Sequence, residues 1–232
     1  MSHCTLNPFE PETDPCHAEW LQGRGPYGEA GAALNMLFRS SVSNNDEADI
    51  FFFGNAGVEF RGFYPDYSLN LGSPLGWSWS MVKMQVGNDA GTVTLRSKNP
   101  RDTPLINFNY FERQAEQDIQ AFTEGYEFAM ELFGVLGEPF SPFAVIEPNL
   151  EVSMRQSIMD HTFGHHVSSS CRMGPKDDPE YCVDSKFKVN GVDGLRVVDA
   201  SVFPRTPGAF TVGPTFIISQ KAFEVIQEEL DL

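Results

Sequence analysis

The stretch Gly-His-His-Val-Ser-Ser-Ser-Cys-Arg-Met-Gly at residues 164–174, followed by Gly-Val-Asp-Gly-Leu-Arg-Val-Val-Asp-Ala-Ser-Val-Phe-Pro at residues 191–204, is the most specific feature of this 232-residue sequence. Three histidines, His161, His165 and His166, lie in or just before the first block. Taken alone, they are either histidines that hydrogen-bond to the backbone or a metal site. The spacing fits no zinc pattern and lacks a second ligand pair.

The two blocks resemble the C-terminal half of the glucose-methanol-choline (GMC) flavoprotein oxidoreductases, which oxidise alcohols with FAD. The resemblance covers roughly residues 20–232 and is strongest from Trp77 onward. It implies FAD as the cofactor, a small-molecule alcohol as the substrate, and hydride transfer from the alcohol carbon to flavin N5. The flavin carries the hydride chemistry, and the protein supplies orientation and charge.

The same resemblance assigns roles to individual residues. His166 falls on the position of the family's catalytic histidine. Its neutral imidazole would accept the proton of the substrate hydroxyl, a contribution typically worth about 10² to 10⁴ in rate. Asp199 and Ala200 occupy positions that contact the flavin end of the cofactor in relatives. Without the resemblance, Asp199 is an acidic residue that caps a turn.

A final helix begins near Pro214 and carries the other predicted cofactor-binding residues, Val212, Gly213 and Thr215. Many relatives place a second catalytic residue, histidine or asparagine, where this chain has Val212. Valine can neither hydrogen-bond the substrate hydroxyl nor stabilise an alkoxide, so this catalytic function is lost at Val212. The amides at the start of the helix would still offer a partial positive charge to a reduced flavin.

The hydrophobic pattern predicts an α+β fold, an antiparallel sheet backed by helices. Alternating residues predict strands near 78–86, 92–97 and 105–109, and apolar residues three or four apart predict helices at 118–136, 150–160 and 214–230. The run Ile50–Phe53 is a further strand candidate, and the short apolar run Leu195–Val198 resembles the strand that this family returns to its FAD domain. With the resemblance, three segments are expected: a loop-rich region at 1–75, the substrate-binding domain at 76–194, and a strand and helix of an FAD domain at 195–232.

The segment Gly23–Gly28 matches the Gly-x-Gly-x-x-Gly dinucleotide motif letter for letter. That motif requires a buried strand before the glycines and a helix after them. Residues 14–22 are not strand-like, and residues 30–36 are short for the helix, so we interpret the segment as a surface turn. The nucleotide-binding half is therefore expected to be missing, and FAD would bind only when an N-terminal half, in the same chain or a partner chain, completes the site.

Two functions remain open at this stage. The chain is the C-terminal half of an FAD-dependent alcohol oxidoreductase, or it is a non-catalytic remnant or binding module without a complete FAD site. Val212 favours the second interpretation, whereas His166 and the Asp199–Ala200 pair favour the first. Cyanohydrin cleavage is a minor third option, since it also uses a histidine base.

Composition excludes some functions. The formal net charge of −16 argues against nucleic-acid binding, which needs clustered Lys and Arg. The apolar runs are too short to span a bilayer, and neither a signal peptide nor an Asn-x-Ser/Thr sequon is visible, so the compartment stays open.

The cysteines and the aromatic residues each have an ordinary structural interpretation. The four cysteines are expected to be free thiols or to form one incidental pair: Cys4, Cys16, Cys171 and Cys182. The aromatic segments Phe51–Phe53, Phe60–Tyr67 and Trp77–Trp79 belong either to the core or to a pocket for an apolar alcohol.

Overall fold

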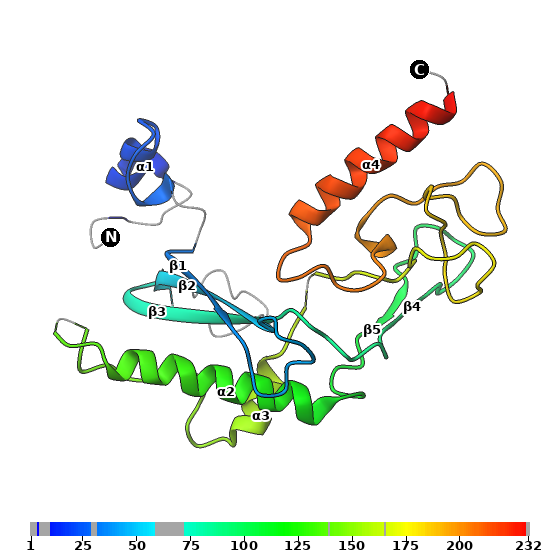
Figure 1. Cartoon of the computed structure of the whole chain (residues 1–232). Coiled ribbons are helices and arrows are strands. Elements are labelled where there is room, and N and C mark those ends of the chain that lie inside the picture. Colours follow the sequence, from blue (N-terminus) through cyan, green and yellow to red (C-terminus); the bar gives the residue numbers. More distant parts are fainter. Residues whose placement is uncertain are drawn as a thin grey trace. The chain divides into compact units, whose positions relative to one another are not determined.

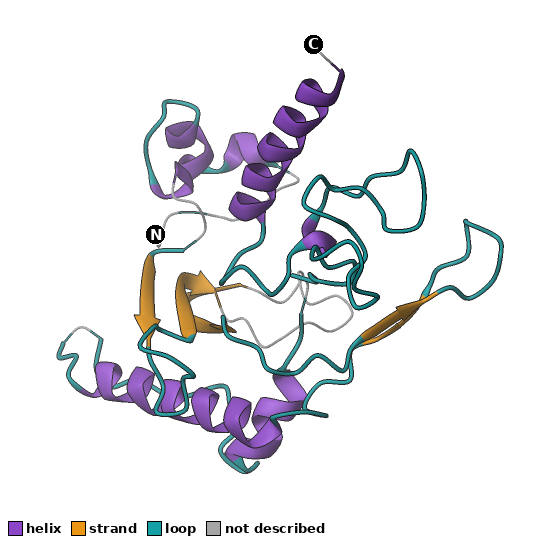
Figure 2. Ribbon diagram, turned by 45° about the vertical axis from the view of Figure 1, so that its right-hand side comes forward, coloured by secondary structure: helices purple, strands orange, loops and turns teal. Residues whose placement is uncertain are grey.

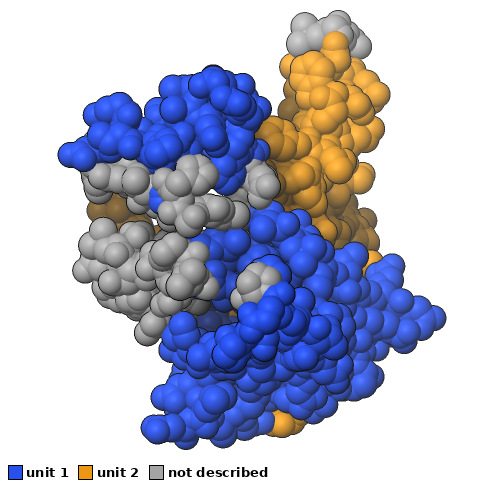
Figure 3. Space-filling view, turned by 90° about the vertical axis from the view of Figure 1, so that its left-hand side faces the viewer, with its two compact units in different colours: residues 1–83, 119–163 blue, residues 84–118, 164–232 orange. Residues whose placement is uncertain are grey.

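The computed structural model describes residues 4, 10–28, 32–58, 72–138, 140–164 and 166–230. The chain divides into two compact units, which Figure 3 shows in different colours. Unit 1 comprises residues 1–83 and 119–163, and unit 2 comprises residues 84–118 and 164–232. Each unit contains antiparallel strands and at least one long helix, which confirms the predicted α+β class. The three segments predicted at 1–75, 76–194 and 195–232 stay a prediction, because the division into compact units does not show which residues complete a cofactor domain.

Unit 1 is built on a three-stranded antiparallel sheet in the order β1-β2-β3 (Figure 1). Its strands are β1 (Leu34–Phe38), β2 (Ile50–Val58) and β3 (Gly72–Lys83). Phe52 in the central strand lies opposite Met36 on one side and Met81 on the other. The strand β1 was not predicted, because its residues are mostly exposed and show no clear alternation.

Helix α2 (Ala115–Gly134) packs against this sheet and makes the core of unit 1 (Figure 2). The buried residues are Ile50, Phe52, Ala121 and Ala129. A Cβ atom added to Gly125 would lie 3.1 Å from Met81 Sδ and 3.3 Å from a Phe52 ring carbon, so the glycine lets the helix approach closely. Phe52 also meets Trp79 edge-on at 5.9 Å between ring centroids. Among the described aromatic residues, Phe52 and Trp79 therefore serve the core, while the segment 60–67 lies outside the described residues.

A buried ion pair closes one end of the sheet. The carboxylate of Asp49 is fully buried and accepts hydrogen bonds from Ser40 N and Ser40 Oγ, both at 2.7 Å. Lys83 Nζ lies 3.0 Å from the same carboxylate. Burial opposes ionisation, but the bonds from Ser40 and the charge of Lys83 outweigh it, so the pKa of Asp49 lies below its ordinary value.

Two smaller helical segments complete unit 1. Helix α3 (Met154–His161) begins four residues later than predicted, at a Ser153 cap whose hydroxyl accepts from Gln156 N. Helix α1 (Pro15–Trp20) begins after Asp14 and is followed by turns and the short 3-10 helix η2 (Pro26–Gly28). Gly23 and Gly25 have φ of 71° and 84°, so this glycine-rich segment forms turns and not a strand–helix junction.

Unit 2 contains the two-stranded ribbon of β4 (Thr92–Thr94) and β5 (Leu105–Asn107) and the final helix α4 (Val212–Leu230). Its core consists of Val183, Phe187, Val202 and Ala222. Near the C-terminal end of α4, Glu229 pairs with Lys186, Lys188 and Arg196, so the helix is tied to the 186–196 loop. The hydrogen bond from Lys188 is the largest cause, and together with Lys186 and the charge of Arg196 it outweighs the opposing effect of burial and lowers the pKa of Glu229 to about 2.

Two expectations need correction. The predicted strand at Leu195–Val198 is reduced to a single β-bridge between Arg196 and Lys188, because the backbone of this segment bonds to an irregular loop, with Val197 N donating to Phe187 O at 3.1 Å. The prediction of free thiols or one pair is wrong: Cys4 pairs with Cys16 and Cys171 pairs with Cys182, which leaves no free cysteine. Each partner lies 11 or 12 positions away, and only the folded backbone brings the two together.

No helix in the described part of the chain combines the length and the apolar character needed to cross a bilayer.

Candidate functional site

The structure lays the two sequence blocks side by side in unit 2. Three backbone hydrogen bonds join them, from Ser169 N to Ala200 O at 3.2 Å, from Cys171 N to Ser201 O at 2.9 Å, and from Met173 N to Val202 O at 2.9 Å. The segment that carries His166 is therefore held against the segment that carries Asp199 and Ala200.

The C-terminal part of the first block, residues 171–174, is held in place by a disulfide and by packing. The Cys171–Cys182 disulfide closes a loop, and a Cβ atom on Gly174 would lie 2.2 Å from the ring of Tyr181, so only glycine fits there. Arg172 lies 3.7 Å from the carboxylate of Glu180 and stacks over the Tyr181 ring. The Cys-Arg-Met-Gly residues thus serve as a scaffold for the residues before them.

His166 is half-buried and meets Phe210 edge-on, with 5.3 Å between ring centroids. Phe210 comes two residues before α4, so this contact brings the histidine to the segment that leads into the helix. His161 belongs to unit 1, where its Nδ1 lies 2.8 Å from Ser157 O and its Nε2 lies 3.8 Å from Glu147. His165 lies outside the described residues. Within the described residues, no three His, Cys, Asp or Glu side chains are grouped so that they could hold a metal ion.

Asp199 is exposed and caps the short 3-10 helix η4 (Ala200–Val202), since its carboxylate accepts a hydrogen bond from Ser201 N at 2.8 Å. The capping role that the sequence alone suggested is thus present. Ala200 is half-buried, and its carbonyl accepts the bond from Ser169. Whether the pair also contacts a flavin stays a prediction.

The other three predicted residues form the first turn of α4. Val212 is the first helical residue, and 65% of its surface is exposed. A Cβ atom on Gly213 would meet no other atom within 4 Å, so the backbone is open on this side. Thr215 donates from both N and Oγ1 to Thr211 O, at 2.9 and 2.7 Å. The N–H groups of Val212 and Gly213 precede the first intrahelical bonds, and they carry the partial positive charge of the helix start.

Sequence reasoning missed one residue of this region, Ser169. Its φ is 67°, in the left-handed region that favours glycine. Its hydroxyl oxygen is buried, and among the described residues it has no hydrogen-bond partner. The neighbouring Ser168 differs, because its Oγ lies 3.3 Å from Thr206 Oγ1. No sequence signal distinguishes the three consecutive serines, since backbone angle and burial appear only in the fold.

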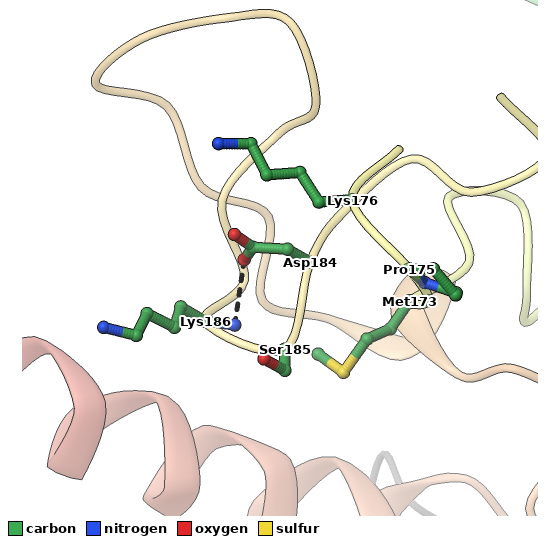
Figure 4. Close-up of a pocket in the computed structure, with 7 residues that line it drawn as sticks. Met173, Pro175, Lys176, Asp184, Ser185 and Lys186 are labelled. Carbon is green, nitrogen blue, oxygen red and sulfur yellow. Dashed lines mark hydrogen bonds between the residues drawn. The ribbon is translucent and has the colours of Figure 1, made fainter. Parts of the chain in front are cut away.

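One pocket of about 420 Å³ lies elsewhere in unit 2 (Figure 4). Its lining consists of Met173, Gly174, Pro175, Lys176, Asp184, Ser185 and Lys186, and includes none of the predicted site residues. The Asp184 carboxylate accepts from the backbone N–H groups of Lys186 and Lys188, at 2.8 and 3.0 Å. This acid therefore shapes the loop that forms the pocket wall.

Comparison with known proteins gives consistent results. The oxygen-dependent choline dehydrogenase of Brucella ovis is 34% identical over 212 residues, which cover 82% of this chain and 37% of the relative. The enzyme of the same description from Rhizobium johnstonii is 28% identical and is matched over 90% of this chain and 38% of its own length. The chain thus spans little more than a third of the length of these curated relatives.

Solved structures share the fold. A formate oxidase structure superposes on 98% of this chain and 43% of its own, with a TM-score of 0.72 at 21% identity. The formate oxidase of Aspergillus oryzae RIB40, a protein described with a modification of its FAD, gives a TM-score of 0.62 at 25% identity over 82% of this chain and 33% of its own.

A family model described as GMC oxidoreductase matches residues 87–219, which include both sequence blocks and the start of α4. This match covers more than half of the chain. The chain therefore belongs to the GMC oxidoreductases, a family of flavoproteins whose cofactor is FAD.

Proposed function

We propose that this chain is the C-terminal, substrate-binding part of an enzyme that oxidises an alcohol with FAD, and that an N-terminal nucleotide-binding part, in the same polypeptide or a partner chain, completes the cofactor site. The observation that carries the proposal is the ladder of backbone bonds that holds the His166 segment against Asp199–Ala200. Family membership supports flavin-dependent oxidation in general.

The residues present fit a flavin. A Cβ atom added to Gly213 would meet nothing within 4 Å, so the backbone at the start of α4 is open to an approaching group. FAD, when bound, would supply the hydride acceptor. The first turn of α4 would favour a negative charge nearby, since a helix start carries roughly half a positive charge.

Proton transfer falls to His166. Its imidazole, oriented by the edge contact with Phe210, would accept the proton of the substrate hydroxyl as the C–H bond is cleaved. Val212 offers no side-chain atom for a second hydrogen bond to that oxygen. This chain's chemistry would then rest on one base and on backbone dipoles.

The first experiment tests the base. The chain would be produced joined to the N-terminal portion of the Brucella ovis relative, and flavin reduction by small alcohols, choline first, would be followed by absorbance. His166→Ala should lower the rate of flavin reduction by about 10² to 10⁴ and retain FAD. His161→Ala is the matched control and should leave the rate near that of the parent, because the His161 ring is already engaged with Ser157 O of its own helix and with Glu147. Equal rates for the two variants would refute the role of His166.

Val212, whose side chain cannot form a hydrogen bond, supports a second candidate function, a binding module without catalysis. Val212→Asn would return a hydrogen-bonding group to the start of α4, and in an active enzyme it should raise the rate up to about tenfold, the effect of one hydrogen bond. Alcohol binding in calorimetry, with no flavin reduction by either the parent or this variant, would favour the binding module.

A further inference from the structure

The side chain of Tyr110 reaches the start of the segment that carries His166, within unit 2. A Cβ atom added to Gly164 would lie 2.7 Å from the hydroxyl oxygen of Tyr110, closer than Cβ atoms come to non-bonded neighbours in folded proteins. The ring carbon that bears the hydroxyl, Cζ, would lie 3.7 Å away, which is an ordinary van der Waals distance. The Tyr110 hydroxyl therefore excludes a side chain at Gly164, two residues before His166.

Tyr110 is itself held in place by its neighbours, although 40% of its surface is exposed. Its ring stacks on that of Phe108, with 5.1 Å between the centroids and 9° between the planes. The residues on either side, Asn109 and Phe111, have φ of 46° and 61°, which is costly for residues other than glycine. Two hydrogen bonds, at 2.8 and 2.9 Å, join Asn109 to the segment 88–90. Strain that the surrounding structure enforces in this way clusters at functional sites.

The contact between Tyr110 and Gly164 bears on the predicted base. The ring of His166 meets Phe210 edge-on, but the backbone that carries His166 sets how far the imidazole extends. Gly164 belongs to that backbone, and a glycine adopts many backbone angles unless a neighbour restrains it. Tyr110 supplies this restraint from outside the segment. A general base must come within about 2.6–3.2 Å of its partner, so the placement of Gly164 affects the chemistry.

We propose that Tyr110 is a positioning residue: its side chain, packed on Gly164, sets where the His166 imidazole lies in the reaction. This inference rests on the proposed function, because it requires that His166 act as the base. Tyr110 acts through the glycine and does not itself contact the substrate. It lies outside both sequence blocks, and only the fold brings it to the first of them.

The test uses the chain joined to the N-terminal portion of the Brucella ovis relative, with flavin reduction by choline as the assay. Gly164→Ala places a methyl group against the Tyr110 hydroxyl and should lower the rate by about 10²-fold, the effect of misplacing a reacting group by about 1 Å. Adding Tyr110→Phe removes the oxygen that the methyl group meets, so the double variant should recover most of the loss. Tyr110→Phe alone keeps the stacked ring and should react like the parent.

Gly137→Ala is the matched control, because a Cβ atom added there meets nothing within 4 Å, and its rate should equal that of the parent. Equal FAD content in all variants shows that the rates report the reaction and not a weakened fold. Should Gly164→Ala lose its flavin, Tyr110→Ala carries the comparison: it removes the support and should be slow, whereas Tyr110→Phe should not.

The position of the base can also be measured without turnover. In NMR spectra, the ring proton of His166, assigned through His166→Ala, should shift in Gly164→Ala, because the imidazole moves relative to the ring of Phe210. The signal should return toward its parental position when Tyr110→Phe is added. An unshifted signal in Gly164→Ala would contradict the proposed link between Gly164 and the imidazole.

Three kinetic results would overturn the inference. The first is a parental rate in Gly164→Ala, and the second is a loss that Tyr110→Phe does not rescue, since the contact is then not its cause. The third is a slow Tyr110→Phe variant, which would assign the hydroxyl a direct contact with the substrate. If the parent reduces no flavin, the proposed function falls as well, whereas an active parent with an equally active Gly164→Ala variant rejects only the role of Tyr110.

Discussion

The ion pair between Asp49 and Lys83 offers a sharp test of how unit 1 is stabilised. Both side chains are largely removed from water, with 0% of Asp49 and 11% of Lys83 exposed. Asp49→Asn keeps the shape and an oxygen that can accept from Ser40 N, but it removes the negative charge. Lys83, whose side chain is only 11% exposed, then loses the carboxylate that lies 3.0 Å from its Nζ.

The expected loss follows from that burial. Removing one member of a buried ion pair typically lowers the free energy of unfolding by about 3–5 kcal/mol, because the remaining charge has lost its compensation. This is a large part of the roughly 5–15 kcal/mol that stabilises a whole domain. Adding Lys83→Met to Asp49→Asn should recover much of the loss, since an apolar side chain then replaces the buried cation.

Asp46→Asn is the matched control. Asp46 lies three residues away and pairs with Arg39 at 2.9 Å, but its side chain is 99% exposed. Solvent screens such a pair, so this variant should unfold like the wild type. Urea unfolding followed by tryptophan fluorescence gives both comparisons, because Trp79 lies in the core of the same unit. If Asp49→Asn and Asp46→Asn unfold alike, the buried pair is not a major stabilising interaction.

The pH dependence provides an independent check. The folded-state pKa of Asp49 is lowered, so its stabilising effect is complete above the unfolded value of about 3.9 and is lost as the pH falls through the lower folded value. Wild-type stability should therefore drop more steeply below about pH 4 than that of Asp49→Asn. Parallel curves would contradict the low pKa.

Three further predictions concern packing, covalent links and the exposed face of α4. Gly125→Leu should lower the free energy of unfolding by about 1–3 kcal/mol through overpacking against the sheet. Gly134→Ala, with nothing near its added Cβ, should raise the free energy of unfolding by about 0.5–1 kcal/mol. A chemical unfolding series that ranks the two variants otherwise would refute the close contact at Gly125. Replacing Cys171 and Cys182 together by alanine should lower the free energy of unfolding by about 3 kcal/mol, because the unfolded chain gains the entropy of the short loop that the disulfide closes. Thermal unfolding with and without reductant checks this. Helix α4 exposes several large apolar side chains, Phe216 (73%), Ile217 (72%), Phe223 (58%) and Leu230 (61%), so the isolated chain should self-associate in light scattering. Phe216→Lys should reduce this without changing the circular dichroism, and a monomeric wild-type chain would contradict the prediction.

Helices α2, α3 and α4 were predicted within a few residues of their observed bounds because local signals mark them, whereas the short helix α1 was not predicted. The apolar repeat places α2 and α4, and Pro214 suits the first turn of α4, where an N–H group has no intrahelical acceptor. Strand β1 escaped prediction, since its side chains are mostly exposed and only pairing with β2 makes it a strand. The strand expected at Leu195–Val198 failed for the opposite reason: an apolar run needs a neighbouring strand, and here its backbone bonds to a loop.

The sequence by itself determined the family and the α+β class, and it predicted His166, Asp199 and Val212 as site residues, because these inferences depend on residue types at fixed spacings along the chain. Only the tertiary structure decided which segments meet. It joined the two blocks through backbone bonds and paired all four cysteines. It also left the Ser169 hydroxyl buried at a positive φ. Burial, backbone angle and long-range pairing arise from contacts between residues distant in sequence, and no local pattern encodes them.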